Sequence, residues 1–458
     1  MRTCRGVLCF LLAVSAPAGA ELRFGRAAVK ITPTAETGGV RQVLDDLYVK
    51  AAVFEGNGTV AAMAACDLPV INRPVVEAAR RRIEAATGIP AGNVMISATH
   101  THTGLVPGWA GGSWPSLEAA KTGREAGEAG RYTAFLTESI AAAVAAAYKD
   151  RRPARVAAVT GREESLPFNR RFLMRDGTVR FNPGIRNPDI VRPVGPVDGD
   201  VNIAYFEAAG GEPLAALVNY AMHLDTIGRD AYSADYAGAL AKLLAEAKGP
   251  GMLTLFTIGT AGNINHLDVT RPSFAQGYGE AARIGTILAG AVLKAWPGLK
   301  ALDVEAVRVT RETVPLPPVD LAPGDVERAH GLAAREAAGG KPLTLLERVF
   351  TQRVLFAERQ QGRPLDVEVL AVALGRDLAW VALPGEVFVE LGMAIKRGSP
   401  FRYTIVNELA WDWIRYVPNR KGFAEGHYEA TNTRCGPGGG EALADAALRC
   451  LLRLHGQR

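Results

Sequence analysis

The stretch Asn93–Gly104, NVMISATHTHTG, joins a short apolar segment to two histidines. Residues 93–98 have the composition of a buried β-strand. In the extended chain that follows, alternate side chains point to the same side, so His100 and His102 are expected to converge at the end of this strand. Sites collect at strand ends in α/β folds, and His-x-His in an extended segment is typical of metal binding. Two loop histidines without a shared role are the alternative explanation.

Strands and helices alternate on both sides of this stretch, which predicts an α/β protein with mixed β-sheets flanked by helices. The expected strands are 48–54, 60–66, 93–98, a hairpin over 172–181, 201–206, 214–221, 253–258, 304–309, 367–373, 378–383 and 403–406. The expected helices are 74–87, an alanine-rich one ending near 148, one around 240–247, 280–295 and a helical block over 324–361. Since no internal repeat or Pro- or Ser-rich linker interrupts this pattern, residues 21–458 are predicted to form one catalytic unit.

The first twenty residues have the pattern of a secretory signal peptide, with basic Arg2 and Arg5, an apolar run over 7–14, and small residues at 18–20. The sequence therefore predicts an exported protein, periplasmic or extracellular, and a membrane-anchored N-terminus is the alternative. Export would allow a disulfide between Cys435 and Cys450.

Composition narrows the class of protein and of partner. With 48% hydrophobic and 22% charged residues the chain is neither disordered nor fibrous. The net charge is only +5 and no five basic residues stand in a row, so nucleic-acid binding is not expected. Peripheral contact with a membrane stays open, and the sequence does not give an oligomeric state.

Polar residues also follow three other apolar segments. His223 ends the segment that begins at Asn219, and Asp235 opens the next helix, where its carboxylate is expected to support a metal-bound histidine. The glycines of 259–262 let backbone approach a substrate closely. Glu386 is expected at a helix N-terminus, either as an oxygen ligand or as a simple helix-end acid. The residues by themselves thus predict a metal site of two histidines and a glutamate from separate strand ends.

The same segments resemble, in order, the motifs of the neutral and alkaline, non-lysosomal ceramidases, which are zinc-dependent. Residues 97–102, SATHTH, resemble the ATHTHSGP signature of that family. The other matching segments are Asn169–Arg171 (NRS), Asn219–His223 with Ser233–Tyr236 (NYACHP…SxDYPG), Gly262–Asn265 (GDVSPN), Pro384–Glu386 (PGE), and Tyr416 with Tyr428 (YxxT…QxYEG). The resemblance implies a neutral-ceramidase-like catalytic domain over residues 21–458.

The resemblance also implies a division of roles. It implies one Zn²⁺ ion with four ligands: His100, His223, Glu386 and Tyr416. It implies three catalytic groups beside the substrate: His102, Arg170 and Tyr428. Zinc with an open position lowers the pKa of bound water to ~7, and the resulting hydroxide would attack an amide carbonyl. His102 would then transfer protons, and Tyr428 or Arg170 would donate to the oxyanion.

Several positions depart from the family pattern. Asn265 and Asn263 stand where the family has Ser and Asp, Met222 replaces a Cys, and Lys421-Gly422 replaces an acidic pair. The C-terminal immunoglobulin-like domain of the family is expected to be missing, because thirty residues follow Tyr428.

These departures affect the expected substrate more than the expected metal site. The residues expected to bind substrate are Asn265, Gly262 and Trp109, the last by stacking on a ring or flat head group. The expected activity is hydrolysis of an N-acyl amide bond in a small molecule or lipid, with long-chain ceramide a poor substrate. Hydrolysis of an ester or of a small N-acyl sugar amide is one alternative, and a catalytically silent relative that binds a lipid or glycan is another.

Overall fold

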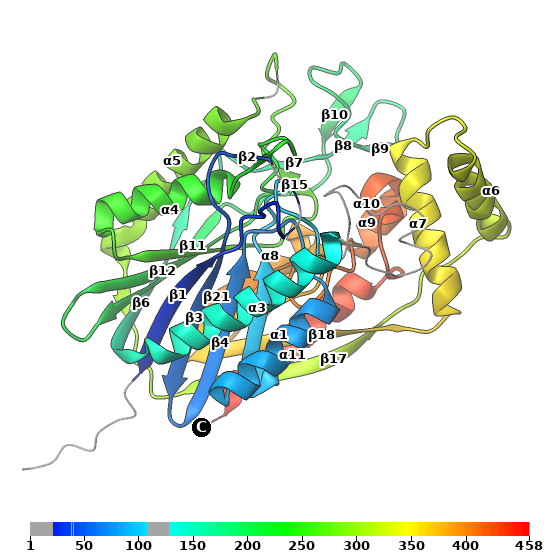
Figure 1. The fold of residues 1–458 in the computed structure, drawn as a ribbon. Helices are drawn as coiled ribbons and strands as arrows, with labels where there is room; N and C mark the ends of the chain where they lie inside the picture. Colours follow the sequence, from blue (N-terminus) through cyan, green and yellow to red (C-terminus); the bar gives the residue numbers. More distant parts are fainter. Residues whose placement is uncertain (1–21, 38, 40, 108–127, 274, 458) are drawn as a thin grey trace, which may run out of the picture.

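The computed structural model describes residues 22–457 apart from 38, 40, 108–127 and 274. The predicted signal peptide, residues 1–20, and Trp109 lie outside the described residues. The expected mixed α/β class is confirmed, since helices cover two β-sheets (Figure 1).

The larger sheet has the strand order β14-β12-β11-β6-β1-β3-β4-β5, with β16 paired to β6. Its strands are β1 (Arg23–Lys30), β3 (Tyr48–Gly56), β4 (Thr59–Cys66), β5 (Val94–Ala98), β6 (Arg152–Arg162), β11 (Asp200–Ala208), β12 (Pro213–Tyr220), β14 (Leu253–Ile258) and β16 (Lys300–Ala301). Most pairs are antiparallel, but β4–β5 and β12–β14 are parallel. Both parallel pairs lie at the edges of the sheet, so β5 and β14 are its two outermost strands.

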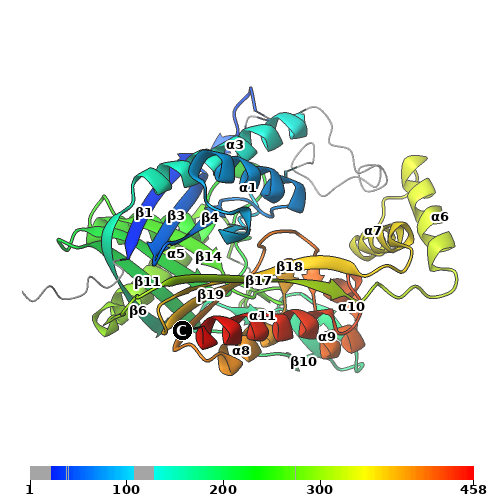
Figure 2. The same cartoon turned by 90° about the horizontal axis from the view of Figure 1, so that it is seen from below.

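The second sheet has the order β17-β18-β19-β21 and packs face to face on the first (Figure 2). Its strands are β17 (Val307–Leu316), β18 (Leu365–Leu374), β19 (Leu378–Ala382) and β21 (Tyr403–Asn407). Side chains alternate along β3: Val49 and Val53 pack toward helices, whereas Ala52 and Phe54 pack toward the second sheet. The ring of Phe54 lies 5.7 Å from that of Trp380 across this interface. The alternating pattern thus produces two cores, one between the sheets and one beneath the helices.

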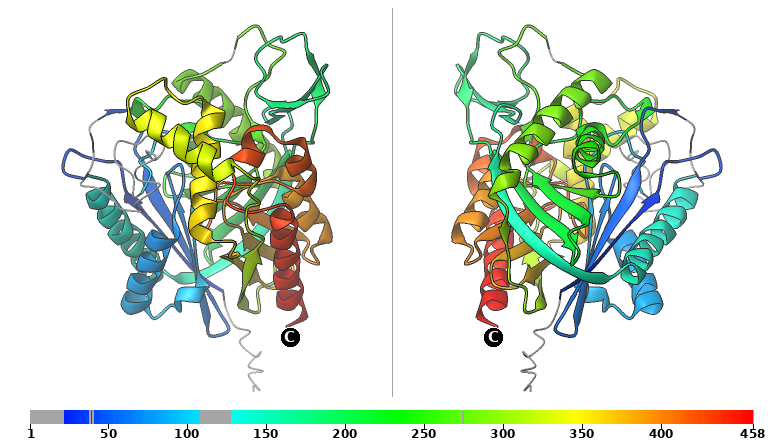
Figure 3. Two further views of the ribbon diagram at one scale, coloured as in Figure 1. Left: turned by 90° about the vertical axis from the view of Figure 1, so that its right-hand side faces the viewer. Right: turned by 90° about the vertical axis from the view of Figure 1, so that its left-hand side faces the viewer.

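Helices cover the outer faces of both sheets (Figures 2 and 3). On the larger sheet lie α1 (Arg73–Thr87), α3 (Glu128–Lys149), α4 (Asp235–Lys248) and α5 (Tyr278–Ala295), and on the second sheet lie α8 (Val389–Gly398) and α11 (Gly439–Gly456). The helical block predicted over 324–361 is a pair, α6 (Asp325–Ala337) and α7 (Leu345–Gln360), beside the short α9 (Arg420–Glu425) and α10 (His427–Thr431). Among the described helices, none is both long and apolar enough to cross a bilayer.

Several short strand pairs lie outside the two large sheets, and those labelled β2, β7, β15, β8, β9 and β10 lie in the upper part of Figure 1. They are β2 (Gln42–Val43) with β13 (Ala231–Tyr232), β7 (Phe168–Asn169) with β15 (Ile264–Asn265), β8 (Arg171–Met174) with β9 (Val179–Phe181) and β10 (Ile190–Pro193), and β20 (Glu386–Val387) with β22 (Tyr416–Val417). Each pair joins segments that are far apart in the sequence, apart from the predicted hairpin β8–β9. Several of the predicted site residues lie in these pairs.

The disulfide that export would allow between Cys435 and Cys450 is not formed in the structure. Cys66, Cys435 and Cys450 are buried free thiols. Cys450 lies inside α11, eleven residues beyond Gly439 at the helix start, whereas Cys435 Sγ would lie 2.8 Å from a Cβ placed on Gly439. At 1.5 Å per residue the helix rises ~16 Å from Gly439 to Cys450, whereas bridged cysteines need Cα atoms within ~7 Å.

Candidate metal centre

The segment after β21 closes the gap between the two edge strands of the larger sheet. Glu408 N donates to Ile258 O at the end of β14 at 3.2 Å, and Ala98 N at the end of β5 donates to Leu409 O at 3.1 Å. Three residues of the segment 409–415 have positive φ. The ends of β5, β12 and β14 are therefore drawn toward one place, which is how distant strand ends come to share a site.

Backbone pairing holds the two histidine segments side by side. Thr101 forms a parallel bridge with Leu224, and His102 N donates to Leu224 O at 3.0 Å. His100 has φ 76°, so the chain turns sharply as β5 ends. Its Nδ1 donates to Pro69 O at 2.6 Å, which fixes the ring and leaves Nε2 facing the centre.

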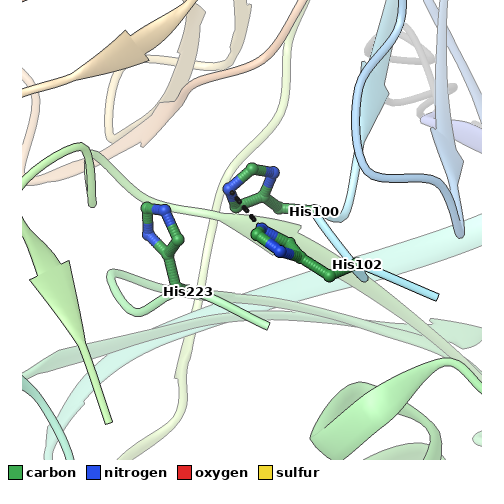
Figure 4. A group of neighbouring side chains, drawn as sticks. All are labelled: His100, His102 and His223. Atoms are coloured by element: carbon green, nitrogen blue, oxygen red, sulfur yellow. Dashed lines mark hydrogen bonds between the residues drawn. The ribbon is translucent and has the colours of Figure 1, made fainter. Parts of the chain in front are cut away.

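The rings of His100, His102 and His223 face one another (Figure 4), and each offers a nitrogen within 4.8 Å of the other two. This confirms the predicted convergence of His100 and His102 and adds His223 from the end of β12. His100 and His223 are 3% and 1% exposed, while His102 is half-buried. The three imidazoles form a cluster that could hold a metal ion.

Glu386 completes the cluster with a carboxylate oxygen. Its Oε2 lies 3.5 Å from His100 Nε2 and 3.4 Å from His223 Nε2. The other oxygen, Oε1, accepts a hydrogen bond from Trp413 Nε1 at 2.9 Å. The residue is in the short strand β20 and α8 begins three residues later, so the predicted place at a helix N-terminus is wrong. Parallel pairing with β22, rather than a helix dipole, positions this carboxylate.

The donor atoms fit a small tetrahedral metal site. Ligands at ~2.0–2.2 Å from zinc in a tetrahedron lie ~3.3–3.6 Å from one another. The two distances from Glu386 Oε2, to His100 Nε2 and to His223 Nε2, fall in that range. Glu386 Oε2 is also buried without a hydrogen-bond donor, as an oxygen that donates its lone pair to a metal would be.

The protonation states suit ligands. Burial, with the nearby Arg170 and His100, lowers the pKa of His223 to about 4. Burial and His100 also hold the pKa of His102 well below its ordinary value. Burial acts to raise the pKa of Glu386, but the neighbouring His100 and His223 outweigh it and hold the pKa well below the usual range. At neutral pH His102 and His223 are therefore neutral, and Glu386 is a carboxylate.

Tyr416 is directly opposite Glu386 in the β20–β22 pair, and the two side chains interact electrostatically. The ring of Tyr428 lies 5.4 Å from that of Tyr416, and its hydroxyl accepts from Asn432 at 3.2 Å. The structure thus brings both predicted tyrosines to the cluster. Burial and the charge of Glu386 raise the pKa of both phenols.

Arg170 contacts the same nitrogen of His223 that faces Glu386. Its Nη1 is 3.1 Å from His223 Nε2, its Nη2 donates to Gly262 O at 2.7 Å, and its Nε donates to Glu429 Oε1 at 3.1 Å. Glu429 also accepts from Arg171, so one buried carboxylate holds two buried guanidinium groups. This network keeps a fixed positive charge beside the cluster.

Gly262 serves the site through its backbone. Its N–H donates to Val387 O at 2.9 Å, and a Cβ on this residue would lie 2.4 Å from Glu386 O. Only glycine lets this loop approach the strand that carries Glu386. Asn265 is fully buried and donates to Asn182 at 3.2 Å. The predicted contact of either residue with a substrate stays a prediction.

Asp235 and Asn219 do not touch the histidine ring that they were expected to hold. Asp235 accepts from the N–H and hydroxyl of Thr226 and from Ile227 N. Asn219 donates to Thr257 and to Val406 O. His223 Nδ1 has no hydrogen-bond partner, so the predicted direct contact is wrong. Asp235 instead fixes the turn that follows His223.

Two site residues were missed from the sequence. Trp413 donates a hydrogen bond to Glu386, and no local sequence pattern around Trp413 predicts that contact. Asp225 pairs with His266, whose Nδ1 lies 2.9 Å from Asp225 Oδ1. Burial acts to raise the pKa of Asp225, but the hydrogen bond from His266 holds it far below its ordinary value. A signal for Asp225 did exist, since His223-Leu224-Asp225 repeats the alternate spacing of His100-Thr101-His102.

Comparisons with known proteins find similar structures but no similar sequences. No family model matches the chain, and no curated protein matches it. Among solved structures it is similar to neutral ceramidase from Pseudomonas aeruginosa, with a TM-score of 0.71 and 18% identity, over 95% of this chain and 75% of that one. A structure described as ceramidase complexed with C2 matches with the same values. The resemblance seen in the motifs is thus confirmed for the fold.

Proposed function

We propose, from a neutral-ceramidase-like fold that carries a buried cluster of metal-binding groups, that this protein is a zinc-dependent hydrolase of an N-acyl amide bond. The observation that carries the proposal is the position of Glu386 Oε2, which lies 3.5 and 3.4 Å from two histidine nitrogens and accepts no hydrogen bond. A buried carboxylate oxygen without a donor is costly unless a cation fills the space between these groups.

Zinc is the metal that this donor set favours. Imidazole nitrogens with carboxylate and phenol oxygens, without thiolates, suit Zn²⁺ among the common metals. The residues that would hold it are His100, His223, Glu386 and Tyr416. When bound, zinc supplies Lewis-acid activation of water and of the amide carbonyl.

The surrounding residues would then orient the substrate and move protons. His102 is the half-buried member of the cluster and is neutral at pH 7, so it can take a proton from water and give it to the leaving amine. Arg170 and Tyr428 lie beside the buried ligands and can donate to the carbonyl oxygen as negative charge develops on it. Arg170 is fixed by Glu429, so little rearrangement is needed during the reaction.

The experiment that tests this proposal combines metal analysis with an assay for released amine. Purified protein is expected to contain one zinc per chain and to hydrolyse short N-acyl amides, with activity lost on chelation and restored by zinc. Full activity in metal-free protein would contradict the proposal. Ester turnover without amide turnover would favour the alternative hydrolase, and zinc binding with no turnover of either would favour a binding protein.

The place of action is also a proposal. The signal-peptide pattern of residues 1–20 supports export to the periplasm or the extracellular space, where a small-molecule or lipid substrate would be met. Mass spectrometry of the protein secreted from its host would show a mature N-terminus at residue 21. A protein that retains residues 1–20 would support a membrane-anchored N-terminus instead.

A further inference from the structure

The two histidine segments form a two-by-two arrangement of side chains. Thr101 and Leu224 are paired in a parallel bridge. In parallel pairing, neighbouring residues across the bridge share a face, and alternate residues along each segment share it too. His100 is therefore beside His223, and His102 is beside Asp225. The 4.4 Å between the rings of His100 and His223 agrees with this arrangement.

The two rows of this arrangement differ in exposure. His100 and His223 form an inner row, buried against Glu386. His102 and Asp225 form an outer row, because His102 is half-buried and the Asp225 side chain is 23% exposed. Asp225 is not part of the cluster formed by the three histidines. It thus places a carboxylate on the accessible side of the candidate metal centre.

The Asp225 carboxylate is held rigidly and still has an oxygen to offer. Its Oδ1 accepts from Nδ1 of His266, whose side chain is 3% exposed. The next two residues, Thr226 and Ile227, are fixed by Asp235. The other oxygen of Asp225, Oδ2, accepts no hydrogen bond from any residue that the structure describes. This oxygen is also not fully buried. A fixed carboxylate with an accessible oxygen needs little ordering to bind a donor.

We propose that Asp225 binds a hydrogen-bond donor, a hydroxyl or an ammonium, on the amine half of the substrate. The proposal rests on the amide hydrolysis proposed above, in which the neighbouring His102 protonates the leaving amine. The amine half then lies along the outer row, where its substituent meets Asp225 Oδ2. Hydrogen bonds to a carboxylate are stronger than neutral ones, and an apolar substituent there would leave the carboxylate desolvated without a partner.

The test uses three acetamides of equal length that differ only in the terminal group of the amine. They are N-acetyl-2-aminoethanol, N-acetylethylenediamine and N-acetylpropylamine, and their hydroxyl, ammonium and methyl ends separate the two donors from an apolar control. The wild-type kcat/KM is expected to be ~10–100-fold higher for the preferred donor than for the methyl compound, the range for a hydrogen bond to a charged group. The hydroxyl and ammonium arms show which donor the site takes.

Variants assign that preference to Asp225. In Asp225→Ala the ratio of donor to methyl compound is expected to fall to about 1. Asp225→Asn keeps the shape and an acceptor for His266, and is expected to lose most of the preference for the ammonium compound. Asp320→Ala removes an exposed carboxylate outside the site and should keep the wild-type ratio. Melting temperature and zinc content show whether each variant is folded. If Asp225→Ala is not folded, the ratio measured in Asp225→Asn tests the role of Asp225 instead.

Calorimetry with the free amines separates this inference from the proposed reaction. 2-Aminoethanol, ethylenediamine and propylamine are titrated into zinc-loaded wild-type and Asp225→Asn protein. Each amine carries at least one ammonium group at neutral pH, so the informative quantity is binding relative to propylamine. If no amide is hydrolysed but 2-aminoethanol or ethylenediamine binds more tightly than propylamine, and Asp225→Asn removes that difference, the reaction is wrong and the recognition site stands. If amides are hydrolysed but the methyl compound is as good as both others, with no change in Asp225→Asn, the reaction stands and the recognition site is overturned.

Discussion

Replacing Gly262 by alanine tests how closely the loop after β14 must approach the strand that carries Glu386. The new Cβ would lie 2.4 Å from Glu386 O and 2.8 Å from the carbonyl carbon of the same residue. Ordinary contacts begin near 3.4 Å, so loop and strand must separate by about 1 Å. Both contacts are with backbone, and no side-chain rotation can relieve them. Overpacking of this kind costs ~1–3 kcal/mol.

The displacement should affect the site more than the fold. The loop carries the carbonyl that accepts from Arg170, and the strand carries the proposed ligand Glu386. Misplacing catalytic groups by ~1 Å can cost ~10²-fold in rate. Gly262→Ala is therefore expected to lower the melting temperature moderately, to weaken zinc retention and to reduce kcat/KM for a short N-acyl amide by roughly that factor.

Gly290→Ala is the matched control. Gly290 is exposed in α5, and a Cβ there meets nothing within 4 Å. Alanine is the better helix former by up to ~1 kcal/mol, so this variant should be slightly stabilised and fully active. Differential scanning calorimetry, zinc titration and amide kinetics on both variants decide the matter. A Gly262→Ala protein as stable and active as the control would refute the close approach as a requirement of the site.

Three further outcomes are expected. His100→Ala should lose zinc, whereas His102→Ala should retain zinc and lose turnover; equal loss of zinc by elemental analysis would make His102 a ligand. Burial raises the pKa of Asp235 to about 6 in the folded protein, above the ordinary 3.8, so its stabilising contribution is present below pH ~4 and is lost as pH rises through 6. The unfolding free energy of wild type relative to Asp235→Asn should thus fall between pH 4 and 7 in urea titrations, and a constant difference would contradict the shift. Finally, a fluorescent long-chain ceramide should release amine more slowly than short N-acyl amines, and equal or faster release would restore ceramide as the substrate.

Local signals in the sequence were sufficient for most of the secondary structure. Asn72 caps α1 and Gly88 ends it with φ 74°, as the pattern around 74–87 predicts. The segments 48–54 and 60–66 pair as β3 and β4, and the buried strand before the histidines is β5. The sequence did not reveal β6, which joins the two halves of the larger sheet. Its central run, VAAV, is short, half alanine and contains no polar residue, so no alternation between two faces marks it as a strand.

The sequence also determined which residues would form the metal cluster, because alternate spacing at a strand end is a local property. His100 and His102 converge for that reason, and polar residues at the ends of other apolar segments indicated His223 and Glu386. The motif resemblance added Arg170 and the two tyrosines, and the fold brings all of them together. The partner that each side chain contacts depends on segments that are distant along the chain, so only the tertiary structure decided these partners. Asp235 turned toward Thr226 rather than His223, and Glu386 entered a strand pair rather than a helix. Asp225 gained His266 as its partner from a loop 41 residues away, because side-chain contacts across a fold follow from strand order and loop packing, which no local pattern records.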